Sequence, residues 1–171
     1  MGRKTLFAGL ISIIIPCVIY FIIPKVKKHS GAVLSFFLII YIIGMFYLTL
    51  GSRHTGMQNI NLSLFWSYKR FRQADVRWQI YMNIFLFIPF GFMLSYLLSD
   101  KTHWNSAIVL CATAIAGFAL SLFIESMQYY NGLGLCELDD ILNNTIGAVS
   151  GYGLLRILAF VQRRSDEKKW Y

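Results

Sequence analysis

Polar side chains occur inside or at the edges of long apolar stretches of this sequence, where contact with lipid would make them costly. The six that stand out are Asn83, Glu125, Gln128, Asp139, Asp140 and Asn144. A charged side chain at the centre of a membrane helix costs on the order of 2.5–3.5 kcal/mol on insertion scales. We therefore expect these groups to face the interior of a helix bundle or a water-filled cavity, where they could bind a ligand.

Helical spacing predicts that several of these groups converge. On one helix, steps of four, four and three residues place on a single face Gly117, Ser121, Glu125 and Gln128. On the next helix, a shared face holds Asp140, Asn144, Gly147 and Gly151. The segment between them, Y-Y-N-G-L-G-L-C, has two glycines and no charge, which is compatible with a tight hairpin. Such a hairpin would bring the polar ends of both faces together.

Two carboxylates and an asparagine at one rim of a bundle are compatible with several kinds of chemistry. Glu125 and Asp140 could bind a ligand by hydrogen bonds or charge, act as general base and acid, or hold a divalent metal ion. The chain has no Ser-His pair and no His-rich metal spacing, so we expect neither a cofactor nor a metal. A structural interpretation also stands. Asp139 or Asp140 can cap a helix, and the other groups can hydrogen-bond between helices.

The connection over residues 51–79 mixes aromatic and basic side chains in an unusual way. Its notable members are Trp66, Lys69, Arg70, Arg72 and Arg77. Aromatic rings prefer the boundary between lipid and water, and arginine binds phosphate groups. We expect this segment to lie along the membrane surface and to be partly helical. It could serve as a plain anchor or as a surface for an anionic head group, a pyrophosphate or a polymer.

The elements that must position these groups form a single polytopic α-helical membrane domain over residues 1–171. Hydrophobic residues make up 57% of the chain and charged ones 14%, against about 25% charged in a typical soluble domain. Five apolar stretches approach the roughly 20 residues that a helix needs to cross a membrane. They lie at about 6–23, 32–50, 80–98, 105–124 and 141–161. The residues expected to shape helix packing are Pro89, Gly91, Gly117, Gly147 and Gly151.

Charge indicates membrane lipids rather than nucleic acid as partners. The net charge is +8, but the basic residues lie between the spans, where they match anionic head groups and topology signals. Compact basic clusters at 25–29 and in the C-terminal tail favour an N-terminus outside and a C-terminus inside. The segment 126–140, which has no Lys or Arg, is then outside. The pair Gly147 and Gly151 could support internal packing or a homodimer.

Four motifs, in this order between membrane spans, resemble the VanZ-like family. They are N-I-N-L-S-L-F-W-S-Y at 59–68, N-I-F-L-F-I-P-F-G-F at 83–92, E-S-M-Q at 125–128 and D-D-I-L-N-N-T-I-G-A-V-S-G at 139–151. The resemblance covers about residues 59–155. The family's polar motif includes Asn83, Glu125, Gln128, Asp140 and Asn144, and Glu137 and Asp139 stand where it usually has acidic or similar residues.

The resemblance implies a bacterial cytoplasmic-membrane protein linked to low-level resistance to glycopeptide antibiotics, especially teicoplanin. Together with the polar residues, it favours a protein that binds or shields a lipid-linked cell-wall precursor, a teichoic-acid-type polymer or the lipoglycopeptide at the outer leaflet. An intramembrane enzyme acting on such a precursor, and a small lipid transporter, are the alternatives. The family commonly has an arginine shortly before the acidic pair, where this chain has Leu133–Leu135. Arg70, Arg72 or Arg77 could replace it; otherwise this member is altered or inactive in that respect.

Overall fold

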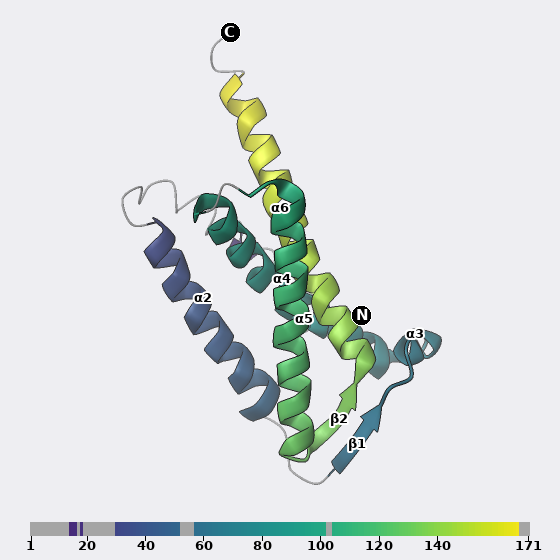
Figure 1. The fold of residues 1–171 in the computed structure, drawn as a ribbon. Helices are drawn as coiled ribbons and strands as arrows, with labels where there is room; N and C mark the ends of the chain where they lie inside the picture. Colours follow the sequence, from purple (N-terminus) through teal and green to yellow (C-terminus); the bar gives the residue numbers. More distant parts are fainter. Residues whose placement is uncertain (1–13, 17, 19–29, 52–56, 102–103, 168–171) are drawn as a thin grey trace.

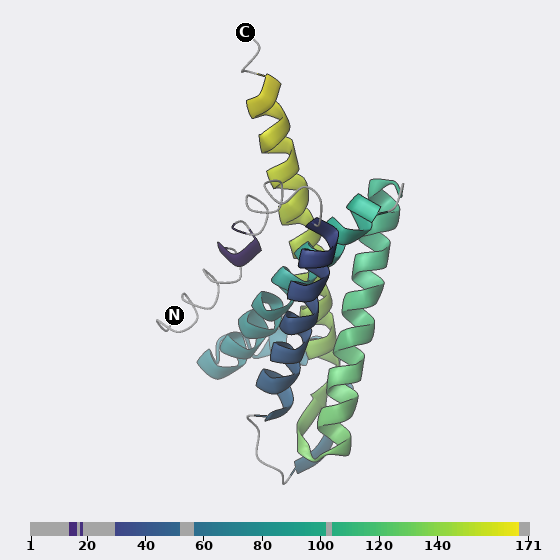
Figure 2. The ribbon, with the colours of Figure 1, turned by 90° about the vertical axis from the view of Figure 1, so that its left-hand side faces the viewer.

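The computed structural model of this protein describes residues 14–16, 18, 30–51, 57–101 and 104–167. Four long helices dominate this part of the chain, namely α2 (Ser30–Phe46), α4 (Ala74–Lys101), α5 (Ser106–Tyr130) and α6 (Leu138–Glu167) (Figure 1). The last turns of α6 extend past the other long helices in both views (Figures 1 and 2). A π-helical turn, η2 (Tyr47–Gly51), continues α2, and a short helix, α3 (Trp66–Lys69), precedes α4.

These four helices are long and apolar enough to cross a membrane. They correspond to the spans predicted at 32–50, 80–98, 105–124 and 141–161. The fifth predicted span, 6–23, falls outside the described residues except for 14–16 and 18. Two helices are longer than their apolar runs, since α4 already begins at Ala74 and α5 continues to Tyr130. These polar extensions carry much of the candidate site.

The chain reverses between α5 and α6, as a hairpin there would require, but the connection contains a short strand rather than a tight turn alone. Strand β2 (Leu133–Glu137) pairs in parallel with β1 (Met57–Asn61), from Met57 opposite Leu133 to Asn61 opposite Glu137. Gly132, with φ 63°, allows the reversal after α5. An extended segment must pair its backbone N–H and C=O groups, and the α2–α3 connection supplies that partner. The strands therefore join two distant connections at one end of the bundle (Figure 1).

Glycines bring α4 and α6 into backbone contact. A Cβ on Gly91 would lie 2.0 Å from the Ala148 carbonyl oxygen, and one on Gly151 would lie 2.2 Å from that of Ile88. A Cβ on Gly147 would lie 2.3 Å from the Ile84 carbonyl oxygen. The G-x-x-x-G pair thus packs inside the chain. On α5, a Cβ on Gly117 would meet the Ala148 side chain at 2.6 Å, and Pro89 is buried within a continuous α4.

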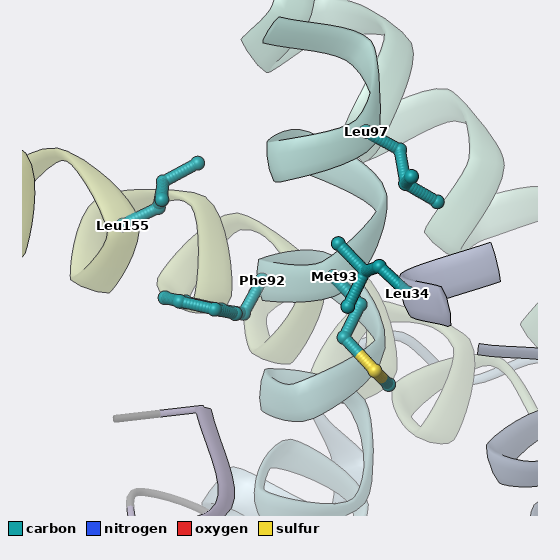
Figure 3. Packing of buried hydrophobic residues seen from close by; sticks show 5 residues of the cluster. All are labelled: Leu34, Phe92, Met93, Leu97 and Leu155. Atoms are coloured by element: carbon teal, nitrogen blue, oxygen red, sulfur yellow. The ribbon is translucent and has the colours of Figure 1, made fainter. Parts of the chain in front are cut away.

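Apolar side chains fill the bundle at two levels. The first cluster joins α2, α4 and α6 through Leu34, Phe92, Met93, Leu97 and Leu155 (Figure 3). The second lies nearer the strands and contains Met45, Phe87, Phe90, Ile124 and Ala148. Large apolar side chains such as Ile43 and Ile115 remain 62% and 68% exposed, which suits helices whose outer surface faces lipid.

Candidate functional site

Four buried carboxylates gather where α5 ends and α6 begins. This acidic cluster consists of Glu125, Glu137, Asp139 and Asp140, each no more than 5% exposed. Glu125 comes from the extended end of α5, Glu137 is the last residue of β2, and both aspartates lie in the first turn of α6. The reversal of the chain between α5 and α6 therefore places half of the protein's eight acidic residues together.

Hydrogen bonds connect Glu125 to Asp140 through Glu137 and Gln79. The backbone N–H of Glu137 donates to Glu125 Oε2 at 3.1 Å. The amide nitrogen of Gln79 donates to Glu137 Oε2 at 2.7 Å and to Asp140 Oδ2 at 3.2 Å. Asn61 also donates to Glu137, at 3.5 Å. The predicted pair of carboxylates thus occupies one network, whose centre is a residue from β2 rather than from a span.

Asp139 has a different role from the other three acids. Its Oδ1 accepts a hydrogen bond from the Phe65 backbone N–H at 2.6 Å. Its Oδ2 accepts from the Ser67 backbone N–H at 2.7 Å and the Ser67 hydroxyl at 2.6 Å. Phe65 has a left-handed backbone, with φ 62°, at the start of α3. The Asp139 carboxylate therefore holds α3 against the first turn of α6.

Three asparagines form an amide layer one helical turn deeper than the acidic cluster. They are Asn83, Asn143 and Asn144. Asn144 donates to the Ser121 hydroxyl of α5 at 2.8 Å, and Asn143 accepts from the Tyr68 hydroxyl of α3 at 2.5 Å. Within the described residues, three buried polar atoms lack a partner: Asn83 Nδ2, Asn143 Nδ2 and Asn144 Oδ1. An unsatisfied buried group costs about 1–3 kcal/mol, so this layer suits a water or a ligand oxygen.

Gln128 and two arginines of the 51–79 segment make contacts outside the acidic cluster. Gln128 donates to the Thr49 carbonyl oxygen of η2 at 3.2 Å. The Arg70 guanidinium carbon lies 4.7 Å from the Trp66 ring centroid, and that of Arg77 lies 5.8 Å from the Phe71 ring centroid. Within the described part of the chain, neither arginine forms an ion pair with an acid, and neither does Arg72. The neutral Gln79 amide donates to two of the carboxylates, those of Glu137 and Asp140.

The sequence of this chain matches one known protein family. The VanZ/LLP1 family model matches residues 36–159, well over half of the chain. The chain belongs to the VanZ/LLP1 family. The match begins within α2, ahead of the motif resemblance at 59, and it includes the acidic cluster, the amide layer and α3. No curated protein and no solved structure matches the chain. Family and apolar helices together identify a VanZ-like membrane protein.

Three residues of the candidate site make contacts that we do not predict from the sequence. Gln79 lies one turn before Asn83 on α4, so the i, i+4 spacing that links the other polar groups would have found it. Glu137 directly precedes the first turn of α6, and its role depends on the β1–β2 pairing. Asn143 adjoins Asn144 but faces Tyr68 of α3, a contact between residues far apart in sequence.

Cys136 of β2 directly precedes Glu137 of the acidic cluster, and its thiol is free and partly buried. Burial raises its pKa, and the negative charges of Glu125, Asp140 and Glu137 raise it further. The thiolate is the nucleophilic form of cysteine, and a raised pKa keeps the group protonated at neutral pH. Cys136 is therefore poorly suited to nucleophilic catalysis. Within the described residues, no three His, Cys, Asp or Glu side chains are arranged to hold a metal ion.

Alkylation of Cys136 tests this electrostatic environment. With Cys17 and Cys111 replaced by serine, we expect iodoacetamide to react slowly at neutral pH, with a midpoint in the pH–rate profile above that of a free cysteine. Glu137→Gln should lower the midpoint and speed the reaction, because it removes one of the charges that raises the pKa. Asp75→Asn, at an exposed position on α4, serves as the control and should change neither value. A midpoint at or below that of free cysteine would contradict this assignment.

Proposed function

We propose that this VanZ-family protein binds an anionic, lipid-bearing molecule at the outer leaflet of the bacterial cytoplasmic membrane. Through this binding it would contribute to resistance against teicoplanin-type glycopeptides. The candidate ligands are a cell-wall precursor, a teichoic-acid-type polymer and the lipoglycopeptide antibiotic. All three combine an apolar chain with polar groups, so all three would meet the protein at the rim of its helix bundle.

The contact of Asp139 with the α3 segment is the observation that carries this proposal. Three hydrogen bonds fix Phe65 and Ser67 to the buried Asp139 carboxylate, so the basic residues that follow have a defined place on the bundle. Lys69, Arg70 and Arg72 are exposed there. Arginine binds phosphate through paired, charge-assisted hydrogen bonds. A positioned basic surface loses less conformational entropy on binding than a loose one, which favours recognition over simple anchoring.

Apolar and polar groups around α3 support a membrane ligand. Leu62, Leu64 and Phe65 precede the helix and are 73%, 45% and 51% exposed, as expected of side chains that insert among lipids. Beneath the rim, the unpartnered atoms of the amide layer could bind a hydroxyl or amide of the same ligand. The basic C-terminal tail and the absence of Lys and Arg from 126–140 favour an outward placement of this end.

The network of carboxylates keeps one alternative open, namely an enzyme acting on a lipid-linked envelope precursor. Glu125, Glu137 and Asp140 share one hydrogen-bonded network, and paired carboxylates can divide acid and base roles. Turnover of a precursor by the purified protein, lost in both Glu125→Gln and Asp140→Asn, would favour this function. If the purified protein shows no turnover and both variants still bind the precursor, the binding proposal above is favoured.

Substitution of Arg70 tests the binding proposal with a closely matched control. Arg70 lies 4.7 Å from the Trp66 ring centroid, and Arg164, at the far end of α6, lies 4.7 Å from that of Phe160. We expect Arg70→Gln to raise the dissociation constant for polyprenyl pyrophosphate in nanodiscs by about tenfold, the loss of one charge-assisted contact. Arg164→Gln should leave the constant unchanged.

The same two variants should differ in a bacterial host. At equal protein levels, the strain carrying Arg70→Gln should become more susceptible to teicoplanin than the strain carrying Arg164→Gln. Equal binding and equal susceptibility for both variants would refute a ligand surface at α3. That result would leave interfacial anchoring as the role of the basic residues.

A further inference from the structure

A cavity with both polar and apolar walls lies at the opposite end of the bundle from the acidic cluster. It has a volume of about 270 Å³ and opens between the last turns of α4 and the second half of α6. Its walls include Tyr96, Ser99 and Asp100 of α4 together with Leu155, Arg156 and Arg163 of α6. Neither the acidic cluster nor α3 contributes to it, so the ligand proposed for that end of the bundle does not account for this cavity.

Two arginines, Arg156 and Arg163, line this cavity. Arg156 and Arg163 are seven residues apart, which places them on one face of α6 about 10 Å apart along its axis. Both are exposed, and among the side chains that the structure describes neither forms an ion pair, although Asp100 lines the same cavity. The next residue, Arg164, lies over the Phe160 ring instead. Two like charges at one cavity attract an anion.

The cavity is at the level where lipid head groups meet this end of the protein. It includes Ser99 and Asp100, and the candidate membrane span of α4 ends at Asp100. Trp104, just before α5, is 46% exposed, as is typical of an interfacial tryptophan. Arg156 lies within the candidate membrane span of α6, Leu138–Arg164. An arginine at this depth can extend its long side chain toward the phosphate level.

We propose that this cavity binds a phospholipid with one negative charge and a hydroxyl-bearing head group, as in phosphatidylglycerol. Arg156 and Arg163 would hold the phosphodiester, and Ala159 between them leaves room for it. Ser99 and Asp100 would accept hydrogen bonds from the glycerol hydroxyls, and Leu155 would contact the apolar part of the lipid. Two arginines and one aspartate sum to +1, which matches a monoanionic lipid and disfavours a zwitterionic one.

Lipid binding to the full chain tests this site. In mixed micelles, phosphatidylglycerol should raise the melting temperature of the protein more than phosphatidylethanolamine or phosphatidylcholine does. Native mass spectrometry should also show that it binds more tightly than either of these lipids. Arg156→Gln and Arg163→Gln should each weaken phosphatidylglycerol binding by about tenfold. Arg164→Gln, with the same change in charge, should bind like the unaltered protein. Arg156→Lys should retain part of the affinity, because it keeps the charge but loses the paired hydrogen bonds.

Several outcomes would overturn this proposal. Equal binding of all three lipids would remove the head-group site, and equal losses at Arg156, Arg163 and Arg164 would reduce it to diffuse attraction by positive charge. Binding of phosphatidylethanolamine as tight as that of phosphatidylglycerol would contradict the charge match. These results do not depend on pyrophosphate binding at the other end of the bundle, so the two sites can be tested separately.

Discussion

Replacing Gly151 with alanine is expected to destabilise the protein by more than about 3 kcal/mol, the upper range for overpacked cores. The new Cβ would lie 2.2 Å from the Ile88 carbonyl oxygen, 2.6 Å from the Phe92 nitrogen and 3.0 Å from the Gly91 carbonyl carbon. All three are backbone atoms, so no side-chain rotation relieves the clash. Only a separation of α4 from α6 would make room, and this would disrupt the packing around Phe92.

Gly153 provides the matched control, because it lies on the same helix and a Cβ there would meet nothing within 4 Å. Gly153→Ala should be neutral or slightly stabilising, since alanine favours a helix over glycine by up to about 1 kcal/mol. Thermal denaturation of the detergent-purified proteins, followed by size-exclusion chromatography, compares the two variants. Equal melting temperatures would mean that α4 and α6 do not approach as closely as described.

Hydropathy predicts where this chain has membrane helices but not where they end. An apolar run shows only which segment lies in lipid. The helix itself can extend further where neighbouring elements form hydrogen bonds with its polar side chains. This is why α4 begins at Ala74 and why α5 carries Glu125 and Gln128 beyond its apolar run. Asn105, by contrast, marks the start of α5 locally, because its side chain accepts a hydrogen bond from the Ile108 N–H at 2.9 Å.

The two strands could not be predicted from local sequence. M-Q-N-I-N and L-G-L-C-E contain few strong strand formers, and Gly134 adopts a φ of 144°. Each strand exists because the other is beside it, and the register joins residues that are 76 positions apart, such as Asn61 and Glu137. Helical periodicity carries no information about such a contact, so the position of Glu137 at the centre of the network could not be derived.

The convergence of Glu125 and Asp140 was predictable because it follows from helical spacing and one reversal of the chain. The roles of the individual acids were not. Two adjacent aspartates in one helical turn look equivalent in the sequence, yet Asp139 contacts α3 and Asp140 contacts Gln79 of α4. The difference arises from the direction in which each side chain leaves α6, and it becomes visible only when the neighbouring elements are in place.

Substitution of Asp139 should therefore change amide hydrogen exchange at α3, whereas substitution of Asp140 should not. Asparagine at position 139 keeps one acceptor oxygen and replaces the other with an N–H donor, so the N–H of either Phe65 or Ser67 loses its partner. A hydrogen bond to a charged group contributes about 1.5–3 kcal/mol. We expect Asp139→Asn to increase amide hydrogen exchange over residues 65–71 by at least about tenfold. Asp140→Asn should leave exchange there unchanged, since Asp140 Oδ2 accepts a hydrogen bond from Gln79 of α4 rather than from the α3 segment.

This pair of variants also separates a tether from a ligand contact. Asp139 is buried and its oxygens accept hydrogen bonds from the α3 segment, so it has no need to contact a ligand directly. If α3 must be held in place to bind phosphate, Asp139→Asn should weaken polyprenyl pyrophosphate binding by loosening Arg70, and exchange and affinity should change together. Increased exchange with unchanged affinity would mean that a flexible basic segment binds equally well. Unchanged exchange in Asp139→Asn would instead contradict the tether itself, because three hydrogen bonds to a buried carboxylate cannot be altered without an effect on the backbone they hold.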